Sequence, residues 1–125
     1  MTTQLQIIEN KIEVLSYTDW ITSVNLNVGS HATLIGHSLL GNYNVAKGVK
    51  DGRVVGIVIY QIVGDVCFIY FVHCVGNVVE FDDEFFRMCM LVGVKRVQTT
   101  TTITENTFCR LTQMRKLYSV YEKEL

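Results

Sequence analysis

The chain has 125 residues and a net charge of −1; 49% of its residues are hydrophobic and 18% are charged. This length and apolar content predict one folded domain over 1–125 and exclude a disordered chain. The near-zero charge makes nucleic acid an unlikely partner. The apolar run Val54–Gly64 is only 11 residues long, so no membrane span is expected, because a spanning helix needs roughly 20. The start shows no secretory signal, and we expect a cytoplasmic protein.

The four cysteines lie inside apolar patterns and show no CxxC spacing. This arrangement favours buried, reduced thiols over disulfides or a metal site. They are Cys67, Cys74, Cys89 and Cys109. His31 and His37 are six positions apart with no nearby Cys, Asp or Glu to complete a ligand set, so no metal site is predicted.

The first third of the chain mixes strand and helix signals. Leu5–Leu15 predicts either one bulged strand or two short strands around a turn at Asn10, and we favour a strand ending near Leu15. Ser16–Val28 has apolar residues at helical spacing, with Trp20 as a core anchor. Ser30–Asn42 fits either a second short helix or an ordered loop.

Three strands follow, joined by two tight turns. Tyr43–Lys50 and Arg53–Val63 are separated by Asp51-Gly52, one of the strongest local hairpin signals. Gly64-Asp65 then separates the second run from Val66–Val75. The pattern predicts an antiparallel meander. The second and third runs are apolar on both faces, which indicates central strands covered on both sides.

A helix is predicted over Val78–Val92. Asn77 and Glu80 have the spacing of a capping box. The expected apolar stripe comprises Phe81, Phe85, Met88 and Val92, widened by Phe86 and Met90. The next run, Lys95–Ile103, predicts a strand parallel to Val66–Val75, because strand, helix and strand with short links form a crossover unit.

The threonines of Lys95–Ile103 favour a place near the sheet edge. The last predicted element is a helix over Glu105–Lys123. The resulting fold class is α+β: a mixed sheet with an antiparallel meander, a βαβ crossover and a C-terminal helix.

This order of elements resembles the fold of the GCN5-related N-acetyltransferases, the GNAT family. The resemblance lies in the meander over Tyr43–Val75 and in Asn106 with Arg110-Leu111, which is similar to a pattern of the family's last conserved helix. The family's usual last two strands are expected to be missing here. Compact, divergent GNAT-like proteins occur in bacteriophages, including as virion components, so the resemblance implies a possible phage protein.

The resemblance also implies a place for coenzyme A. The family binds the pyrophosphate of acetyl-CoA at the start of the crossover helix, which corresponds here to Gly76, Asn77 and Val78. Four carboxylates follow within five positions, and no basic residue occurs before Arg87. One like-charge contact at ~4 Å costs about 1–4 kcal/mol, whereas an exposed helix terminus contributes about 0.3–1 kcal/mol. We therefore expect no cofactor.

Two functional hypotheses result. The first is a non-catalytic GNAT-like module that binds a protein partner or forms a homo-oligomer, as a phage structural or host-modulating protein. The alternative is a divergent acyl-CoA-dependent N-acyltransferase, with His73 or a water as base and Tyr118 or Tyr121 as acid, because the family uses a tyrosine as acid. The alternative requires the strands Val66–Val75 and Lys95–Ile103 to diverge, which leaves room for pantetheine.

Overall fold

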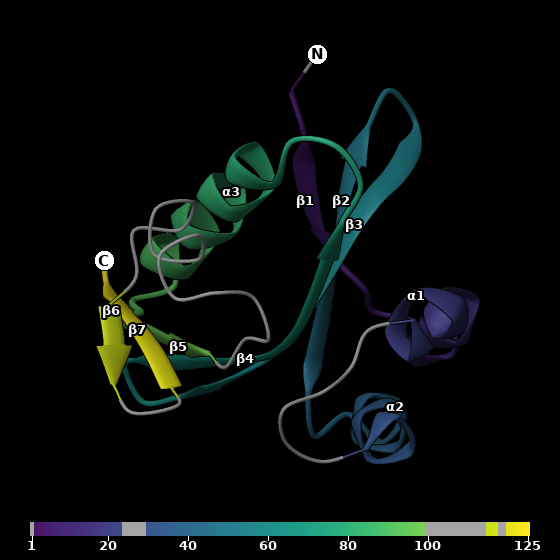
Figure 1. Cartoon of the computed structure of the whole chain (residues 1–125), viewed down its shortest axis with the longest axis horizontal. Coiled ribbons are helices and arrows are strands. Elements are labelled where there is room, and N and C mark those ends of the chain that lie inside the picture. The colour runs from purple at the N-terminus through teal and green to yellow at the C-terminus, as the bar shows by residue number, and fades with distance from the viewer. Residues whose placement is uncertain (1, 24–29, 100–114, 118–119) are drawn as a thin grey trace.

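The computed structural model describes residues 2–23, 30–99, 115–117 and 120–125 (Figure 1). The described helical segments are the 3₁₀ helix η1 (Lys11–Tyr17), α1 (Thr18–Thr22), α2 (His31–Leu40) and α3 (Val78–Leu91). The described strands are β1 (Gln4–Ile7), β2 (Asn44–Lys50), β3 (Arg53–Val63), β4 (Val66–Cys74), β5 (Arg96–Thr99), β6 (Arg115–Leu117) and β7 (Val120–Glu124). They form one sheet in the order β1-β2-β3-β4-β5-β7-β6. The predicted α+β class with a mixed sheet is confirmed.

Helices cover both faces of the sheet. Figure 1 shows α3 on one face and α1 with α2 on the other. The side chains of β3 alternate between two buried clusters: Val58 and Tyr60 pack with α3, whereas Ile57 and Ile59 pack on the α1 side. The prediction that the two long apolar strands are central and covered on both sides is therefore confirmed.

Both predicted hairpins form. β2, β3 and β4 pair antiparallel in sequence order. Asp51 and Gly52 have φ values of +54° and +76°, the two consecutive positive φ angles that a type I′ turn requires. The two turn signals in the sequence were therefore sufficient to predict this meander.

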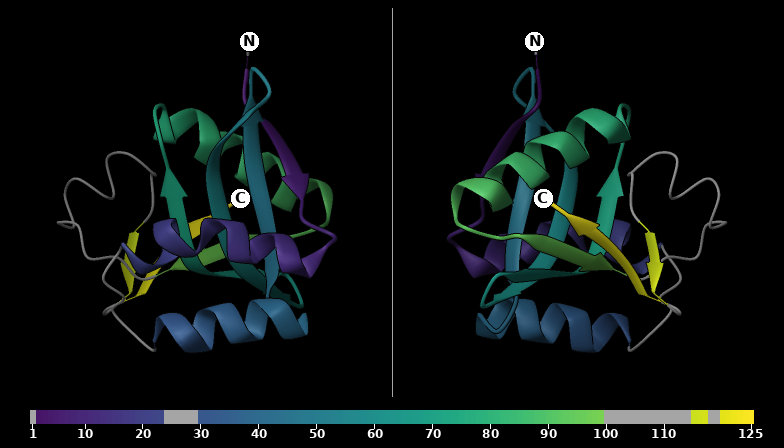
Figure 2. Two further views of the ribbon diagram at one scale, coloured as in Figure 1. Left: turned by 90° about the vertical axis from the view of Figure 1, so that its right-hand side faces the viewer. Right: turned by 90° about the vertical axis from the view of Figure 1, so that its left-hand side faces the viewer.

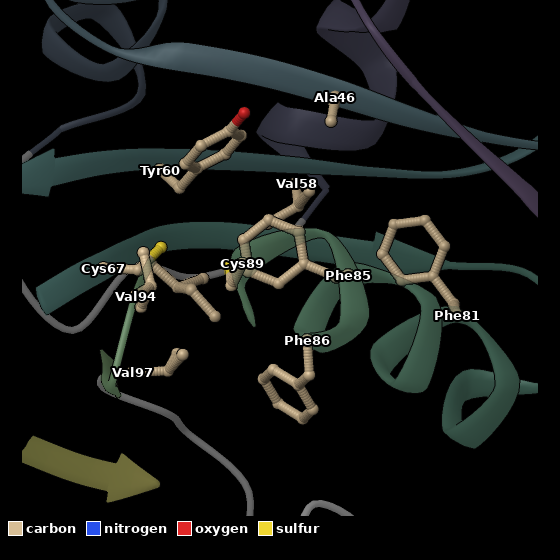
Figure 3. Close-up of a cluster of buried hydrophobic side chains, with 11 residues drawn as sticks. Ala46, Val58, Tyr60, Cys67, Phe81, Phe85, Phe86, Cys89, Val94 and Val97 are labelled. Carbon is tan, nitrogen blue, oxygen red and sulfur yellow. The ribbon is translucent and has the colours of Figure 1, made fainter. Parts of the chain in front are cut away.

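Phe81 locks α3 against the sheet over two glycines. A Cβ atom at Gly48 would lie 2.6 Å from the Phe81 ring, and one at Gly56 would lie 2.9 Å from it. Gly48 and Gly56 are cross-strand partners in β2 and β3. The ring therefore occupies the space that two side chains would fill, and it is fully buried together with Phe85 (Figure 3).

The predicted stripe of α3 is right at its start and wrong at its end. Phe81, Phe85 and Phe86 are buried and Met88 is partly buried, but Met90 and Val92 are exposed. Cys89, one turn beyond Phe85, is buried instead. The helix ends at Leu91, so the positions after it no longer follow helical spacing.

The N-terminal prediction needs one correction. β1 ends at Ile7, and the second half of the predicted strand is the helix η1. The side chain of Asn10 caps this helix by accepting from the N–H of Ile12. Further on, the undecided segment Ser30–Asn42 contains the helix α2.

The C-terminal prediction was wrong. β6 and β7 form an antiparallel pair where a helix was expected, and β7 pairs with β5. The two last strands are thus present, and β5 lies inside the sheet between β4 and β7. Residues 105–114 of the predicted helix lie outside the described residues. The Tyr- and Val-containing end of the chain suits a strand, and pairing it satisfies the backbone groups of β5.

Candidate functional site

The candidate site is the second half of β4, beyond its last described pair with β5. The two strands pair in parallel from Val66 opposite Arg96 to Ile69 opposite Thr99. The Thr99 hydroxyl donates to the Ile69 carbonyl oxygen, 3.1 Å away, at this last pair. β4 continues to Cys74, and Figure 2 shows its second half turning away from β5. The described part of β5 ends at this last pair, so the divergence of the two strands that the acyltransferase hypothesis requires stays a prediction.

A bulge in β4 lies directly after its last described pair with β5. Tyr60 pairs with Ile69 and Ile59 pairs with Phe71, so Tyr70 has no opposite residue in β3. An extra residue of this kind bends a strand and increases its local twist. The bulge also changes which side chains face each side: Ile69 packs with α3, whereas Phe71 packs on the α1 side.

The backbone of the second half of β4 has an edge that no described strand pairs with, called the free edge below. The Val75 N–H donates to the Val55 carbonyl oxygen at 2.7 Å. Every second residue in this half of β4, counted back from Val75, therefore points its backbone N–H and C=O groups at β3. The N–H and C=O groups of Val72 and Cys74 consequently point away from β3. Within the described residues no strand pairs with this edge. A ligand with amide groups is able to bind there as an added strand does.

Exposed apolar side chains lie around this edge. Val72, Val75 and Val79 are 38%, 58% and 41% exposed. They come from the end of β4, the following turn and the start of α3. Apolar surface next to free backbone amides suits a ligand that is both aliphatic and amide-bearing.

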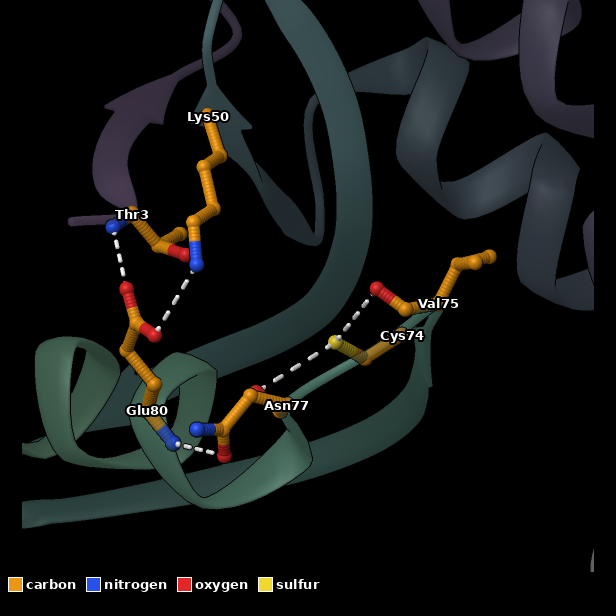
Figure 4. A network of polar contacts seen from close by, with 6 residues as sticks. All are labelled: Thr3, Lys50, Cys74, Val75, Asn77 and Glu80. Carbon is orange, nitrogen blue, oxygen red and sulfur yellow. Dashed lines mark hydrogen bonds and ion pairs between the residues drawn. The ribbon is translucent and has the colours of Figure 1, made fainter. Parts of the chain in front are cut away.

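The start of α3 adjoins the end of β4 (Figure 4). Gly76 has a φ of +99°, a conformation that a residue with a side chain rarely adopts. The Asn77 side chain accepts from the Glu80 N–H at 3.0 Å, as predicted for the helix cap. The N–H groups of Val78 and Val79 have no acceptor in the described part of the chain. The three predicted cofactor-binding residues, Gly76, Asn77 and Val78, thus lie together beside the free edge.

Two of the four carboxylates of α3 point elsewhere. Glu80 accepts from the Thr3 N–H and pairs with Lys50 at 3.4 Å (Figure 4). The backbone hydrogen bond from Thr3, followed by the side chains of Thr3 and Lys50, lowers the pKa of Glu80. Glu84 pairs with Arg87 at 2.6 Å. The predicted repulsion by four free acids is therefore weaker than the sequence indicates.

Asp82 is the carboxylate that matters at the site. It is partly buried, and burial first and the Asp83 charge second raise its pKa to about 7, against an opposing effect of Lys123. The thiol of Cys74 also has a raised pKa, first through burial and then through the charges of Asp82 and Glu80. Above about pH 7, where Asp82 is ionised, its charge and that of Glu80 disfavour a further negative charge between the end of β4 and α3.

The structure describes the strand positions of two of the three predicted catalytic residues. His73 lies in β4 with its ring 5.0 Å from the ring of Trp20, on the face opposite to Cys74. Tyr118 lies outside the described residues. Tyr121 lies in β7 opposite Thr99. Their catalytic roles stay predictions.

Other kinds of site are not evident in the described ranges. No helix there is long and apolar enough to span a membrane. No group of three His, Cys, Asp or Glu side chains there is placed to hold a metal ion. A separate groove of about 400 Å³ lies between β1 and α3 and shares no residue with the site. It is lined by Gln4, Leu5, Glu84, Arg87, Met88 and Leu91.

Cys67 and Cys89 are buried free thiols, as predicted, and Cys74 is a partly buried one. Sequence reasoning missed the free edge at Val72 and Cys74 and the burial of Asp82. Strand length gave no signal for the edge, because the predicted strands Val66–Val75 and Lys95–Ile103 have nearly equal lengths.

Comparison with known proteins places this geometry in a known fold. The sequence matches no protein-family model and no curated protein. The structure is similar to a GNAT-family acetyltransferase from Streptococcus pneumoniae, with a TM-score of 0.63, 12% identity and coverage of 98% of this chain and 99% of that one. It is also similar to the ribosomal-protein-S18-alanine N-acetyltransferase of Escherichia coli, with a TM-score of 0.68, 9% identity and coverage of 97% and 91%.

A third similar structure is an aminoglycoside acetyltransferase in complex with coenzyme A and kanamycin. The TM-score is 0.71, the identity is 8%, and 98% of this chain and 95% of that chain are covered. Identities this low establish the fold alone. The chain has a GNAT-like fold.

Proposed function

We propose that this protein is an N-acyltransferase that uses an acyl-CoA thioester, with acetyl-CoA as the donor to test first. The observation that carries the proposal is the free edge of β4 at Val72 and Cys74, next to the start of α3. The similar solved structures are acetyltransferases, and one of them is a complex with coenzyme A. They support this proposal better than the hypothesis of a non-catalytic module.

The described residues fit the pantetheine part of such a donor. Its two amide groups match the outward N–H and C=O groups of Val72 and Cys74, and its aliphatic segments match the exposed side chains of Val72, Val75 and Val79. A bound acyl-CoA supplies an acyl group activated as a thioester. The fit to the pyrophosphate is poorer, because Asp82, where it is ionised, disfavours a further negative charge in this region.

The reaction needs two proton transfers. The acceptor amine forms a C–N bond with the acyl carbon as the C–S bond breaks; the amine loses a proton and the thiolate gains one. We assign the first transfer to His73 or a water, and the second to Tyr118 or Tyr121. These roles rest on the predictions above and are tested by the pH dependence of turnover in His73→Gln, Tyr118→Phe and Tyr121→Phe variants.

The non-catalytic alternative keeps one supporting observation: the sequence has no Lys or Arg between Arg53 and Arg87. A protein partner, a homo-oligomer and a cytoplasmic location stay predictions under either function. The comparisons give no support to a bacteriophage origin or a virion role.

Titration calorimetry with acetyl-CoA tests the proposal. We expect one site per chain, abolished by Val72→Trp, which fills the expected divergence between β4 and β5. Val63→Trp is the matched control, because Val63 is also an exposed strand valine but lies at the far end of β3. The absence of binding at about 1 mM ligand, equivalent to less than about 4 kcal/mol of binding free energy, would refute the proposal.

A further inference from the structure

The candidate site has two parts with different chemistry. The edge of β4 offers neutral backbone groups and the exposed valines Val72, Val75 and Val79. The start of α3 offers unused N–H groups at Val78 and Val79, but Asp82 lies on the same helix, one turn beyond Val78. A ligand that spans both parts meets apolar surface and amides at one end and a carboxylate at the other.

Cations near the second part are scarce. The sequence has no Lys or Arg from Val54 to Phe86. Lys50, in β2, already pairs with Glu80 at 3.4 Å. Lys123 lowers the pKa of Asp82, against the effect of burial, so part of its positive charge is already offset by that carboxylate.

The environment of the Cys74 thiol indicates the sign of the electrostatic potential between the edge of β4 and the start of α3. Its thiol lies on the α3 side of β4, and its sulfur lies 3.9 Å from the Asn77 carbonyl oxygen. The charges of Asp82 and Glu80 disfavour the thiolate there. A phosphate group near the start of α3 carries the same sign of charge and meets the same repulsion.

We propose that the site recognises its donor through the acyl-pantetheine arm alone, and that the nucleotide diphosphate of coenzyme A adds no affinity. This inference rests on the proposed function. It assigns the donor class as an acyl-pantetheine thioester, of which acetyl-CoA is only one carrier. Recognition of the donor then comes from the edge of β4. The start of α3 connects the helix to β4 and does not bind phosphate.

The test compares acetyl-CoA with S-acetylpantetheine, which lacks the nucleotide, by titration calorimetry at low ionic strength and pH 8, above the Asp82 pKa of about 7. We expect dissociation constants that agree within about threefold. Acetyl-CoA binding more than about thirtyfold tighter would overturn this inference and leave the proposed function standing. If neither ligand binds, the proposed function fails and this inference fails with it.

Asp82→Asn gives a second readout. Removing this charge should strengthen acetyl-CoA binding by about threefold to tenfold and leave S-acetylpantetheine binding unchanged. Asp83→Asn is the matched control, because Asp83 is the adjacent, exposed carboxylate. Added salt should strengthen acetyl-CoA binding to the native chain, since it screens a repulsion. Weaker binding at higher salt would show an attractive phosphate site and overturn the inference.

Discussion

The pH dependence of stability tests the environment assigned to Asp82. Burial and the Asp83 charge raise the pKa of this carboxyl group from 3.8 to about 7, although Lys123 partly opposes them. The folded chain therefore binds more protons than the unfolded chain between these two pH values. The stability linked to the protonated carboxyl is complete below about pH 4 and is lost as the pH rises to about 7.

The magnitude follows from the size of the shift. A difference of about three pKa units corresponds to about 4 kcal/mol as an upper limit, at 1.36 kcal/mol per unit. Asp82 is only partly buried, so water screens part of this effect. We expect a loss of about 1–2 kcal/mol on ionisation.

The perturbation is Asp82→Asn, which removes the ionisable group and keeps its shape. The unfolding free energy of the variant minus that of the native chain should rise by about 1–2 kcal/mol from pH 4 to pH 8. Both unfolding free energies are measured in urea at each pH. Asp83→Asn, at the exposed neighbour, should show a smaller change. If the difference between Asp82→Asn and the native chain is the same at pH 4 and pH 8, the assigned environment is wrong. A loss of stability in Asp82→Asn at pH 8 would show that the attraction to Lys123 dominates.

Three further predictions concern the rest of the fold. Phe81→Ala should cost about 3–5 kcal/mol of unfolding free energy. Gly48→Ala should cost about 1–3 kcal/mol in the native chain, but less in a chain that also carries Phe81→Leu, because the clash with the ring is then absent. Equal costs of Gly48→Ala in the two backgrounds would exclude this steric explanation. Glu13→Gln should cost less than about 1 kcal/mol at pH 7, because hydrogen bonds from Lys47 and Tyr17 lower the Glu13 pKa. This cost should shrink as the pH falls through that lowered pKa, and urea curves at pH 7 and in acid check this. In timed alkylation followed by mass spectrometry, Cys74 should react before Cys67 and Cys89, which are fully buried; simultaneous reaction of the three would mean that the chain opens globally.

The sequence by itself determined the local architecture of the middle of the chain. Asp51-Gly52 specifies a type I′ turn because two consecutive residues there must tolerate positive φ. The two-sided apolar pattern of Arg53–Val63 places this strand in the centre of the sheet, and Asn77 caps α3. Each of these features depends on residues a few positions apart, so the order of elements and the place of Gly76–Val78 were predictable.

The tertiary structure decided the features that depend on distant residues. Residues 115–117 and 120–124 form strands rather than a helix because β7 pairs with the backbone of β5, and no local sequence pattern shows that this partner is present. The free edge at Val72 and Cys74 follows a bulge at Tyr70, beyond the last described pair of β4 with β5. The charges of α3 were visible in the sequence, but their ion-pair partners and their burial were not. Thr3, which precedes β1, and Lys50, in β2, both bind the Glu80 carboxylate. Burial, which the spacing of residues in the sequence does not show, raises the pKa of Asp82.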